Sequence, residues 1–111
     1  MRTKYNPFET SERIETKHGI IVKEYSRYTT HRAPEHFFRK FQGFGISKSE
    51  IDILLSNGVT WIFIKYHNTR KNYIYKINID MLKYFETYNH EGDEQIIIPL
   101  KEMECVAEEI K

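Results

Sequence analysis

Two segments of apolar and aromatic residues, separated by a short polar stretch, constrain the fold of this chain most strongly. Residues 60–66 (TWIFIKY) and 73–79 (YIYKINI) are rich in β-branched and aromatic side chains, and the polar stretch HNTRKN lies between them at 67–72. This composition and spacing are typical of two strands joined by a tight connection. The sequence therefore predicts a β-hairpin over residues 60–79.

Successive side chains of a strand point to opposite faces, so the hairpin also predicts which residues meet the core. In the first strand, Ile62 and Ile64 share one face, and Trp61 and Phe63 share the other. Apolar residues on both faces are typical of a central strand that is covered on both sides. In the second strand, Lys76 and its neighbour Asn78 are expected to face water.

The other segments predict a mixture of strands and helices. Ser47 and Glu50 have the spacing of a capping box, so a helix is expected to follow Ser47 and to end at Asn57-Gly58. Periodicity and turn residues predict the remaining elements. These are a strand over 19–28, a loop over 29–32, a short helix from Pro34 to Phe41, a helix from Asp80 to Tyr88, a loop over 90–94, a short strand over 96–98 and a terminal helix over 100–110.

With 111 residues, the chain has the size of one domain. We expect an α+β fold, in which three to four short helices pack on a mixed sheet of about four strands. Residues 1–18 are predicted to be a polar N-terminal segment, and residues 19–111 the single domain. Such a fold class does not by itself define a function.

Several function classes lack their characteristic residues. No apolar run approaches the roughly 18 residues that cross a membrane, and no signal-peptide pattern is present. The lone Cys105 excludes an internal disulfide and a cysteine-based zinc site, and we expect it to be a core residue of the terminal helix in a cytoplasmic protein. Gly43 and Gly45 do not belong to a phosphate-binding loop and are expected to form a turn between helices. The five histidines lack metal-ligand spacing, so we expect neither a metal nor another cofactor.

Charge is unevenly distributed along a chain whose formal net charge is +1. Residues 1–76 hold fourteen lysines and arginines against seven acids, whereas residues 77–111 hold three against nine. This asymmetry indicates either a basic face for nucleic acid or an acidic segment that folds back onto the basic one. It is also compatible with no functional meaning, because halves of a sequence need not form faces.

The leading hypothesis is a small non-enzymatic protein that is either a nucleic-acid-binding protein or a regulatory accessory protein. It would use the basic segment 23–48 and the basic turn 67–72. Basic residues just before a helix N-terminus are locally unfavourable unless an anion is nearby, which indicates a phosphate site at residues 31–40. The candidate nucleic-acid-binding residues are Arg27, His31, Arg32, His36, Arg39, Lys40, Arg70 and Lys71.

Two further hypotheses remain open. One is a protein-interaction module or inhibitor, which could be a homodimer and would use an exposed aromatic surface or the acidic helix over 100–110. A viral or mobile-element accessory protein would also fit this hypothesis. The other is a divergent metal-dependent nuclease. One metal-binding acid and the lysine would be Asp52 and Lys65. Phe63 stands where that arrangement needs a second acid, so Glu35 or Glu50 would have to substitute for it. No membrane partner is expected.

Overall fold

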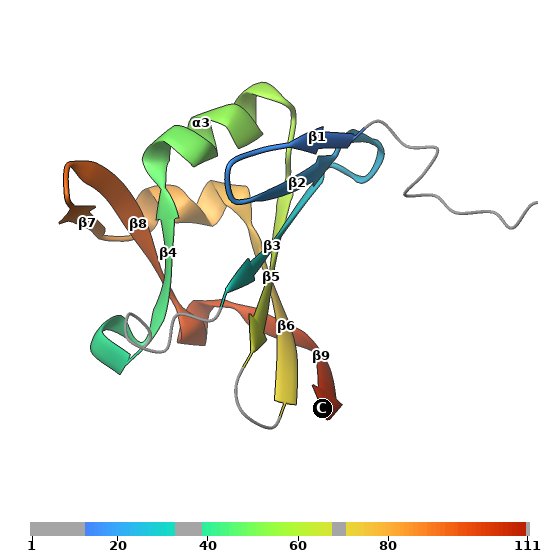
Figure 1. Cartoon of the computed structure of the whole chain (residues 1–111), viewed down its shortest axis with the longest axis vertical. Coiled ribbons are helices and arrows are strands. Elements are labelled where there is room, and N and C mark those ends of the chain that lie inside the picture. Colours follow the sequence, from blue (N-terminus) through green and yellow to red (C-terminus); the bar gives the residue numbers. More distant parts are fainter. Residues whose placement is uncertain (1–12, 33–38, 68–70, 111) are drawn as a thin grey trace, which may run out of the picture.

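In the computed structural model of the chain, two β-sheets face one another, and the structure describes residues 13–32, 39–67 and 71–110. Figure 1 shows the six-stranded sheet nearly edge-on, with the smaller sheet and the helix α3 beside it. The larger sheet is antiparallel except between β3 and β5, which run parallel. Its strands, in spatial order, are β1 (Arg13–Glu15), β2 (Gly19–Val22), β3 (Arg27–Arg32), β5 (Trp61–His67), β6 (Lys71–Asn78) and β9 (Glu104–Ile110).

The smaller sheet has three antiparallel strands, with β8 in the middle. Its strands are β4 (Gly43–Ser47), β8 (Asp93–Pro99) and β7 (Thr87–His90). The helical elements lie between strands and are short. They are the 3-10 helices η1 (Lys23–Tyr25), η2 (Ile79–Tyr84) and η3 (Leu100–Glu102), the α-helix α3 (Lys48–Ser56) and one helical turn at 39–41.

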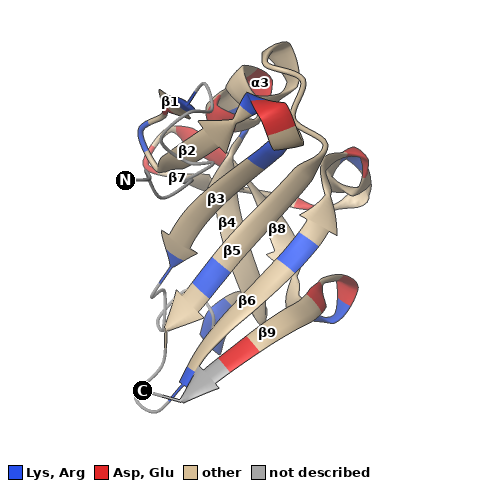
Figure 2. Cartoon of the chain, turned by 90° about the vertical axis from the view of Figure 1, so that its right-hand side faces the viewer, with Lys and Arg blue, Asp and Glu red and all other residues tan. Residues whose placement is uncertain are grey.

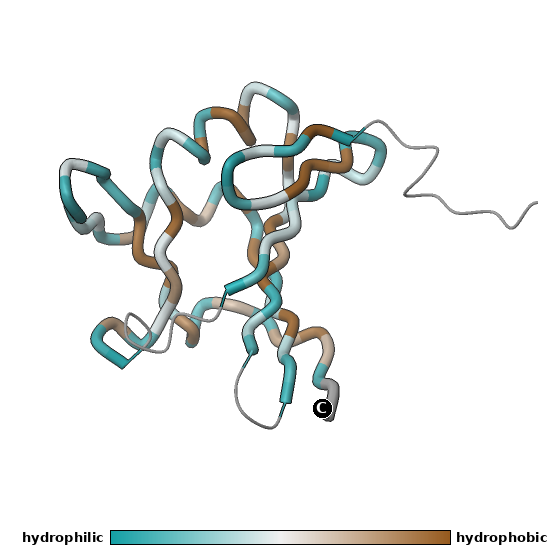
Figure 3. The backbone as a smooth tube through the Cα atoms, in the orientation of Figure 1, coloured by the Kyte–Doolittle hydropathy of each residue, from teal (hydrophilic) through white to brown (hydrophobic). Residues whose placement is uncertain are grey.

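The core lies between the two sheets and under α3. The inner face of the larger sheet contributes Tyr28 and Ile62, each with no exposed surface. The smaller sheet contributes Phe44 and Ile98, which are equally buried, and α3 contributes Leu54. Figure 3 shows hydrophobic segments along the strands and mostly hydrophilic connections between them. Removing this apolar surface from water is the main force that holds the two sheets together.

The predicted fold class is wrong, because the described chain is predominantly β. It contains nine strands in a six-stranded and a three-stranded sheet, instead of four strands with three to four helices packed on them. The predicted polar N-terminal segment, residues 1–18, includes β1, whose three residues pair with β2. No helix in the described residues is long and apolar enough to cross a membrane.

Four segments account for the difference in fold class. The strand predicted over 19–28 is two elements, because the chain turns at η1, and the predicted loop 29–32 belongs to β3. The glycines at 43 and 45 lie in β4 and do not form a turn between helices. The helix predicted over 80–88 is η2 followed by β7, and the terminal helix predicted over 100–110 is η3 followed by β9.

Two predicted elements are confirmed. Strands β5 and β6 form the expected antiparallel hairpin, with Tyr66 opposite Tyr73. The helix after Ser47 spans Lys48–Ser56, and Asn57 follows it as the C-cap residue. The helix predicted from Pro34 has its first five residues outside the described part of the chain.

The predicted capping box does not form, because the Glu50 carboxylate has other partners. Ser47 is the N-cap residue but makes no side-chain capping bond. The Glu50 side chain is buried and accepts hydrogen bonds from Thr16 Oγ1 at 2.7 Å, from the backbone N–H of His18 at 3.2 Å and from Tyr28 Oη at 2.9 Å. Glu50 therefore links α3 to the β1–β2 turn and to β3.

Candidate nucleic-acid interface

The outer face of the six-stranded sheet, the face turned away from β4, β7 and β8, gathers aromatic and basic side chains. Figure 2 looks onto this face and shows lysine or arginine positions on the adjacent strands β3, β5 and β6. No described helix or strand lies over it in that view. Alternation along β5 places Trp61, Phe63 and Lys65 outward, while Ile62 and Ile64 are buried on the inner side.

Trp61 and Phe63 lie in the first half of β5, between two cationic side chains. Trp61 is 36% exposed, and Phe63 is half-buried. On one side, the Arg27 guanidinium lies 5.7 Å from the Phe63 ring centre. On the other side, the Lys76 ammonium lies 4.8 Å from the centre of the Trp61 ring. Each cation is attracted by the electron-rich face of its ring, and the Nε atom of Arg27 is itself buried.

The strand register explains how these residues come together. Arg27 pairs with Trp61, which pairs with Asn78 on β6. Two residues further along β5, Phe63 is opposite Lys76. Cross-strand neighbours and their diagonals lie within reach of long and aromatic side chains, so each cation can approach the ring diagonal to it. The arrangement therefore depends on the parallel pairing of β3 with β5, which brings together residues 34 positions apart.

The same face continues toward the ends of β3 and β5 with a pair of histidines. His31 Nδ1 lies 3.2 Å from His67 Nε2, and His67 Nδ1 lies 2.7 Å from Asn72 Oδ1 on β6. Lys65 is the register partner of His31. We call the residues Arg27, His31, Trp61, Phe63, Lys65, His67 and Lys76 the aromatic–basic face.

The predicted basic residues do not form one surface. Arg27 and His31 belong to the aromatic–basic face, but Arg32, one position along β3, points to the inner side. There burial lowers the Arg32 pKa, against the opposing charge effects of Tyr28 and Glu50. His36 and Arg70 lie outside the described residues.

Arg39, Lys40 and Lys71 are elsewhere in the fold. The exposed Arg39 and Lys40 belong to the helical turn before β4, and the Lys40 ammonium lies 5.3 Å from the Tyr88 ring centre on β7. They are therefore associated with the smaller sheet. Lys71 begins β6 and forms an ion pair with Glu108 of β9.

The acidic C-terminal segment folds back onto part of the basic region. Its strand β9 pairs with β6, and Glu104 lies 3.8 Å from Lys76, in addition to the pair between Glu108 and Lys71. The glutamates are about half to two-thirds exposed, so water screens these pairs. Lys76 thus meets Glu104 at the rim of the aromatic–basic face and Trp61 nearer its centre.

Sequence reasoning missed Trp61, Phe63 and Lys76 as site residues, because both faces of residues 60–66 were predicted to be covered. The exposure of Trp61 shows that this prediction is wrong for the outer face. One signal was available. Lys65 shares the face of Trp61 and Phe63, and the hairpin places Lys76 and Asn78, both predicted to face water, across from them. A covered face would not contain these residues.

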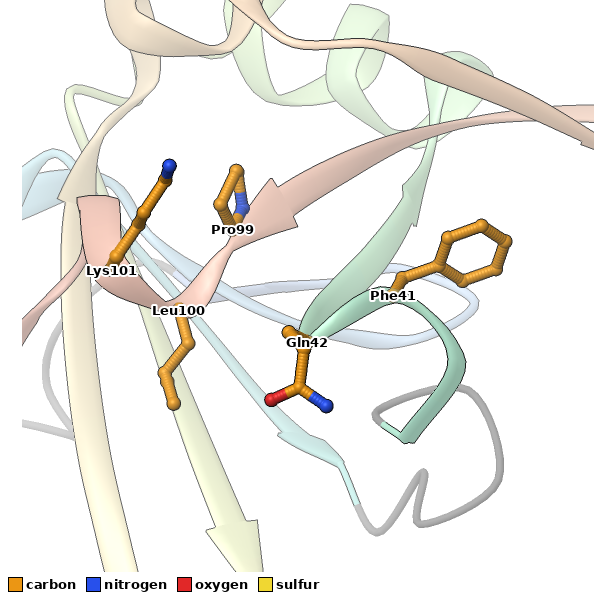
Figure 4. Close-up of a pocket in the computed structure, with 5 residues that line it drawn as sticks. All are labelled: Phe41, Gln42, Pro99, Leu100 and Lys101. Carbon is orange, nitrogen blue, oxygen red and sulfur yellow. The ribbon is translucent and has the colours of Figure 1, made fainter.

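The other candidate residues and the surface hollow give less support for a functional site than the aromatic–basic face does. Asp52, the acid considered with Lys65 for nuclease chemistry, is exposed on α3. Among the described residues, no three His, Cys, Asp or Glu side chains gather in a way that could hold a metal ion. A surface hollow is lined by Phe41, Gln42, Pro99, Leu100 and Lys101, but their side chains point in different directions (Figure 4). It therefore has no converging polar groups.

Comparison with protein-family models, curated proteins and solved structures gave no match.

Proposed function

We propose that this protein binds single-stranded nucleic acid on the aromatic–basic face. Trp61 and Phe63 stack on bases, and the cations Arg27, Lys65 and Lys76 contact the phosphates. The observation that supports this most directly is the pair of partly exposed rings between two cations on a central strand. Proteins that bind single strands without strong sequence preference combine these two features.

A single strand fits this face better than a duplex does. The rings lie within the sheet, so they meet bases only where those bases are unpaired and can turn outward. A duplex presents its bases inside grooves, which are normally entered by a helix or a two-stranded ribbon. Base stacking on an aromatic side chain contributes about 1–3 kcal/mol per base, so two rings and three cations are sufficient for measurable affinity at low salt.

A protein partner on the same face is the second candidate. The exposure of Trp61, together with Tyr25 at 43%, would suit such an interface. Two copies of the face would, however, place Arg27, Lys65 and Lys76 of one copy near the same cations of the other. Like charges facing one another are unfavourable, so a homodimer through this face is disfavoured.

The proposal predicts strong salt dependence. Three phosphate contacts correspond to a slope of roughly −2 in log affinity against log salt, or a loss of roughly 20-fold between about 50 and 200 mM salt. The test uses fluorescence anisotropy with labelled oligo(dT). In the double variant Lys65→Gln/Lys76→Gln, the slope is expected to fall to roughly −0.7, and the affinity at low salt to fall at least tenfold.

The matched control is Lys83→Gln/Lys101→Gln, which removes the same charge from exposed lysines in η2 and η3. It is expected to retain most of the wild-type slope. Equal weakening in both double variants would mean that only net charge matters, and no binding by the wild-type protein at low salt would overturn the proposal.

A further inference from the structure

The two histidines at the end of the aromatic–basic face form an edge-to-edge pair. Their ring planes differ by only 7°, and their ring centres lie 5.4 Å apart. This separation is nearly the largest that a 3.2 Å contact between ring nitrogens allows. The rings therefore lie almost in a common plane, and His31 Nδ1 and His67 Nε2 point at one another. Such an alignment suits a nearly linear N–H···N hydrogen bond.

Asn72 determines which nitrogen holds each proton. Its Oδ1 accepts a hydrogen bond, so His67 Nδ1 must be the donor at 2.7 Å. In a neutral His67, Nε2 is then the acceptor, and His31 Nδ1 must donate to it. The free nitrogen of a neutral His31 is therefore Nε2, on the edge of the ring away from His67.

The pair can take up one proton without losing a hydrogen bond. A proton on His31 Nε2 leaves the bond to His67 in place and makes it charge-assisted, which strengthens it. A second proton would have to reside on His67 Nε2, where two N–H groups would face each other. Protonation thus creates one new outward-facing donor, the N–H at His31 Nε2.

The surroundings of His31 disfavour this proton in the free protein. Burial, His67 and the cation of Lys65 together lower the pKa of His31 below its ordinary value. On the neighbouring strands, β6 contributes the neutral Asn72, and its Lys71 is engaged with Glu108. On the β2 side, the titratable residue His18 directly precedes Gly19, which is the register partner of Thr30. An anion beside His31 and Lys65 would reverse the unfavourable charge interaction.

We propose that His31 and Lys65 form a phosphate subsite of the aromatic–basic face, at which binding of a phosphodiester is coupled to uptake of one proton by His31. This inference rests on the proposed function. Coupling is reciprocal, so a phosphate that favours protonated His31 must bind more tightly as pH falls. Each unit by which the bound phosphate raises the pKa of His31 corresponds to about tenfold in affinity.

The test compares the affinity for oligo(dT) between about pH 8 and pH 5, the range in which histidine titrates, at fixed ionic strength. Thymine does not titrate in this range, so any linkage belongs to the protein. In His31→Asn, the amide can still donate to His67 but cannot be protonated. Wild-type binding is expected to tighten about tenfold more than binding by this variant over the pH range. The control His90→Asn, on β7, is expected to behave as wild type does.

A second measurement follows the His31 ring directly. Its pKa, measured by NMR from the imidazole proton shifts, is expected to rise when inorganic phosphate replaces chloride and to rise again with oligo(dT). Equal pH dependence of wild type and His31→Asn would overturn the subsite while leaving the proposed function intact. If oligo(dT) does not bind at any pH, the proposed function fails. The subsite is then judged by the phosphate titration alone, in which an unchanged pKa would overturn it.

Discussion

The hydrogen bond from Tyr28 to Glu50 joins β3 to α3 in the core, and its removal should lower the free energy of unfolding. Tyr28 has no exposed surface, and its Oη lies 2.9 Å from Glu50 Oε2. A hydrogen bond to a charged acceptor contributes about 1.5–3 kcal/mol. Tyr28→Phe removes the donor and leaves the buried carboxylate with one partner fewer. We therefore expect the free energy of unfolding to fall by about 2 kcal/mol at pH 7.

The same bond predicts how stability changes at high pH. Burial and Glu50 raise the pKa of Tyr28 from its usual 10.0 to about 12. The folded state thus holds the phenol proton more tightly than the unfolded state does. The stabilisation is complete below pH 10 and is lost as pH rises through 12, amounting to about 2.7 kcal/mol in total and about 1.4 kcal/mol at pH 11.

Urea unfolding followed by circular dichroism at pH 7, 9 and 11 measures both effects. Tyr84→Phe is the control, since it removes a phenol that is 72% exposed. Between pH 9 and 11, wild type and Tyr84→Phe should lose about 1.4 kcal/mol more than Tyr28→Phe loses. If Tyr28→Phe is as stable as Tyr84→Phe at pH 7 and declines in parallel with it, the account of this buried network is wrong.

Two further predictions concern β4 and β9. A Cβ at Gly43 would collide with the backbone of Ile98, whereas a Cβ at Gly58 would meet open space and incur only the roughly 1–2 kcal/mol of a left-handed backbone. Gly43→Ala should therefore lower the free energy of unfolding, measured in urea, by more than Gly58→Ala does. Equal losses in the two variants would contradict the β4–β8 pairing. Cys105 is exposed on β9, so a thiol reagent should modify one thiol per chain in the native protein as fast as in urea. Much slower modification of the native protein than of the unfolded protein would contradict the placement of this strand.

The sequence pattern correctly predicted the elements that depend on residues close to one another in the sequence. The β5–β6 hairpin needs only a short connection, and α3 follows from Ser47 and its apolar residues Ile51 and Leu54. Even there, the Glu50 side chain was predicted to cap the helix. It bonds instead to Thr16 and Tyr28, which the chain brings close only on folding.

The sequence pattern gave wrong predictions where pairing with a distant strand outweighed the helical preference of the segment. Leu100, Met103 and Ile110 have helical spacing, yet β9 pairs with β6, and the register shifts between Ile74 and Tyr75. Strand formation depends on such cross-strand neighbours more than on intrinsic preference, so periodicity alone could not predict it. Cys105, expected in the core of a helix, is exposed for the same reason.

The candidate site was predicted only in part, because its residues come from strands that meet through the parallel pairing of β3 with β5. Sequence reasoning named Arg27 and His31 but grouped them with Arg39 and Lys40, which follow them in sequence and belong to the other side of the molecule. It could assign Trp61 and Phe63 to one face of a strand, yet nothing local shows that the face is open.

The most direct test of the proposed interface uses the single tryptophan of the chain, Trp61, as its own reporter. Unlabelled oligo(dT) is titrated into the protein at about 50 and 200 mM salt while tryptophan fluorescence is recorded. Bases stacked on Trp61 should quench its emission, with a midpoint that shifts by roughly 20-fold between the two salt concentrations. Binding detected by anisotropy with unchanged Trp61 emission would place the ligand elsewhere and contradict the account.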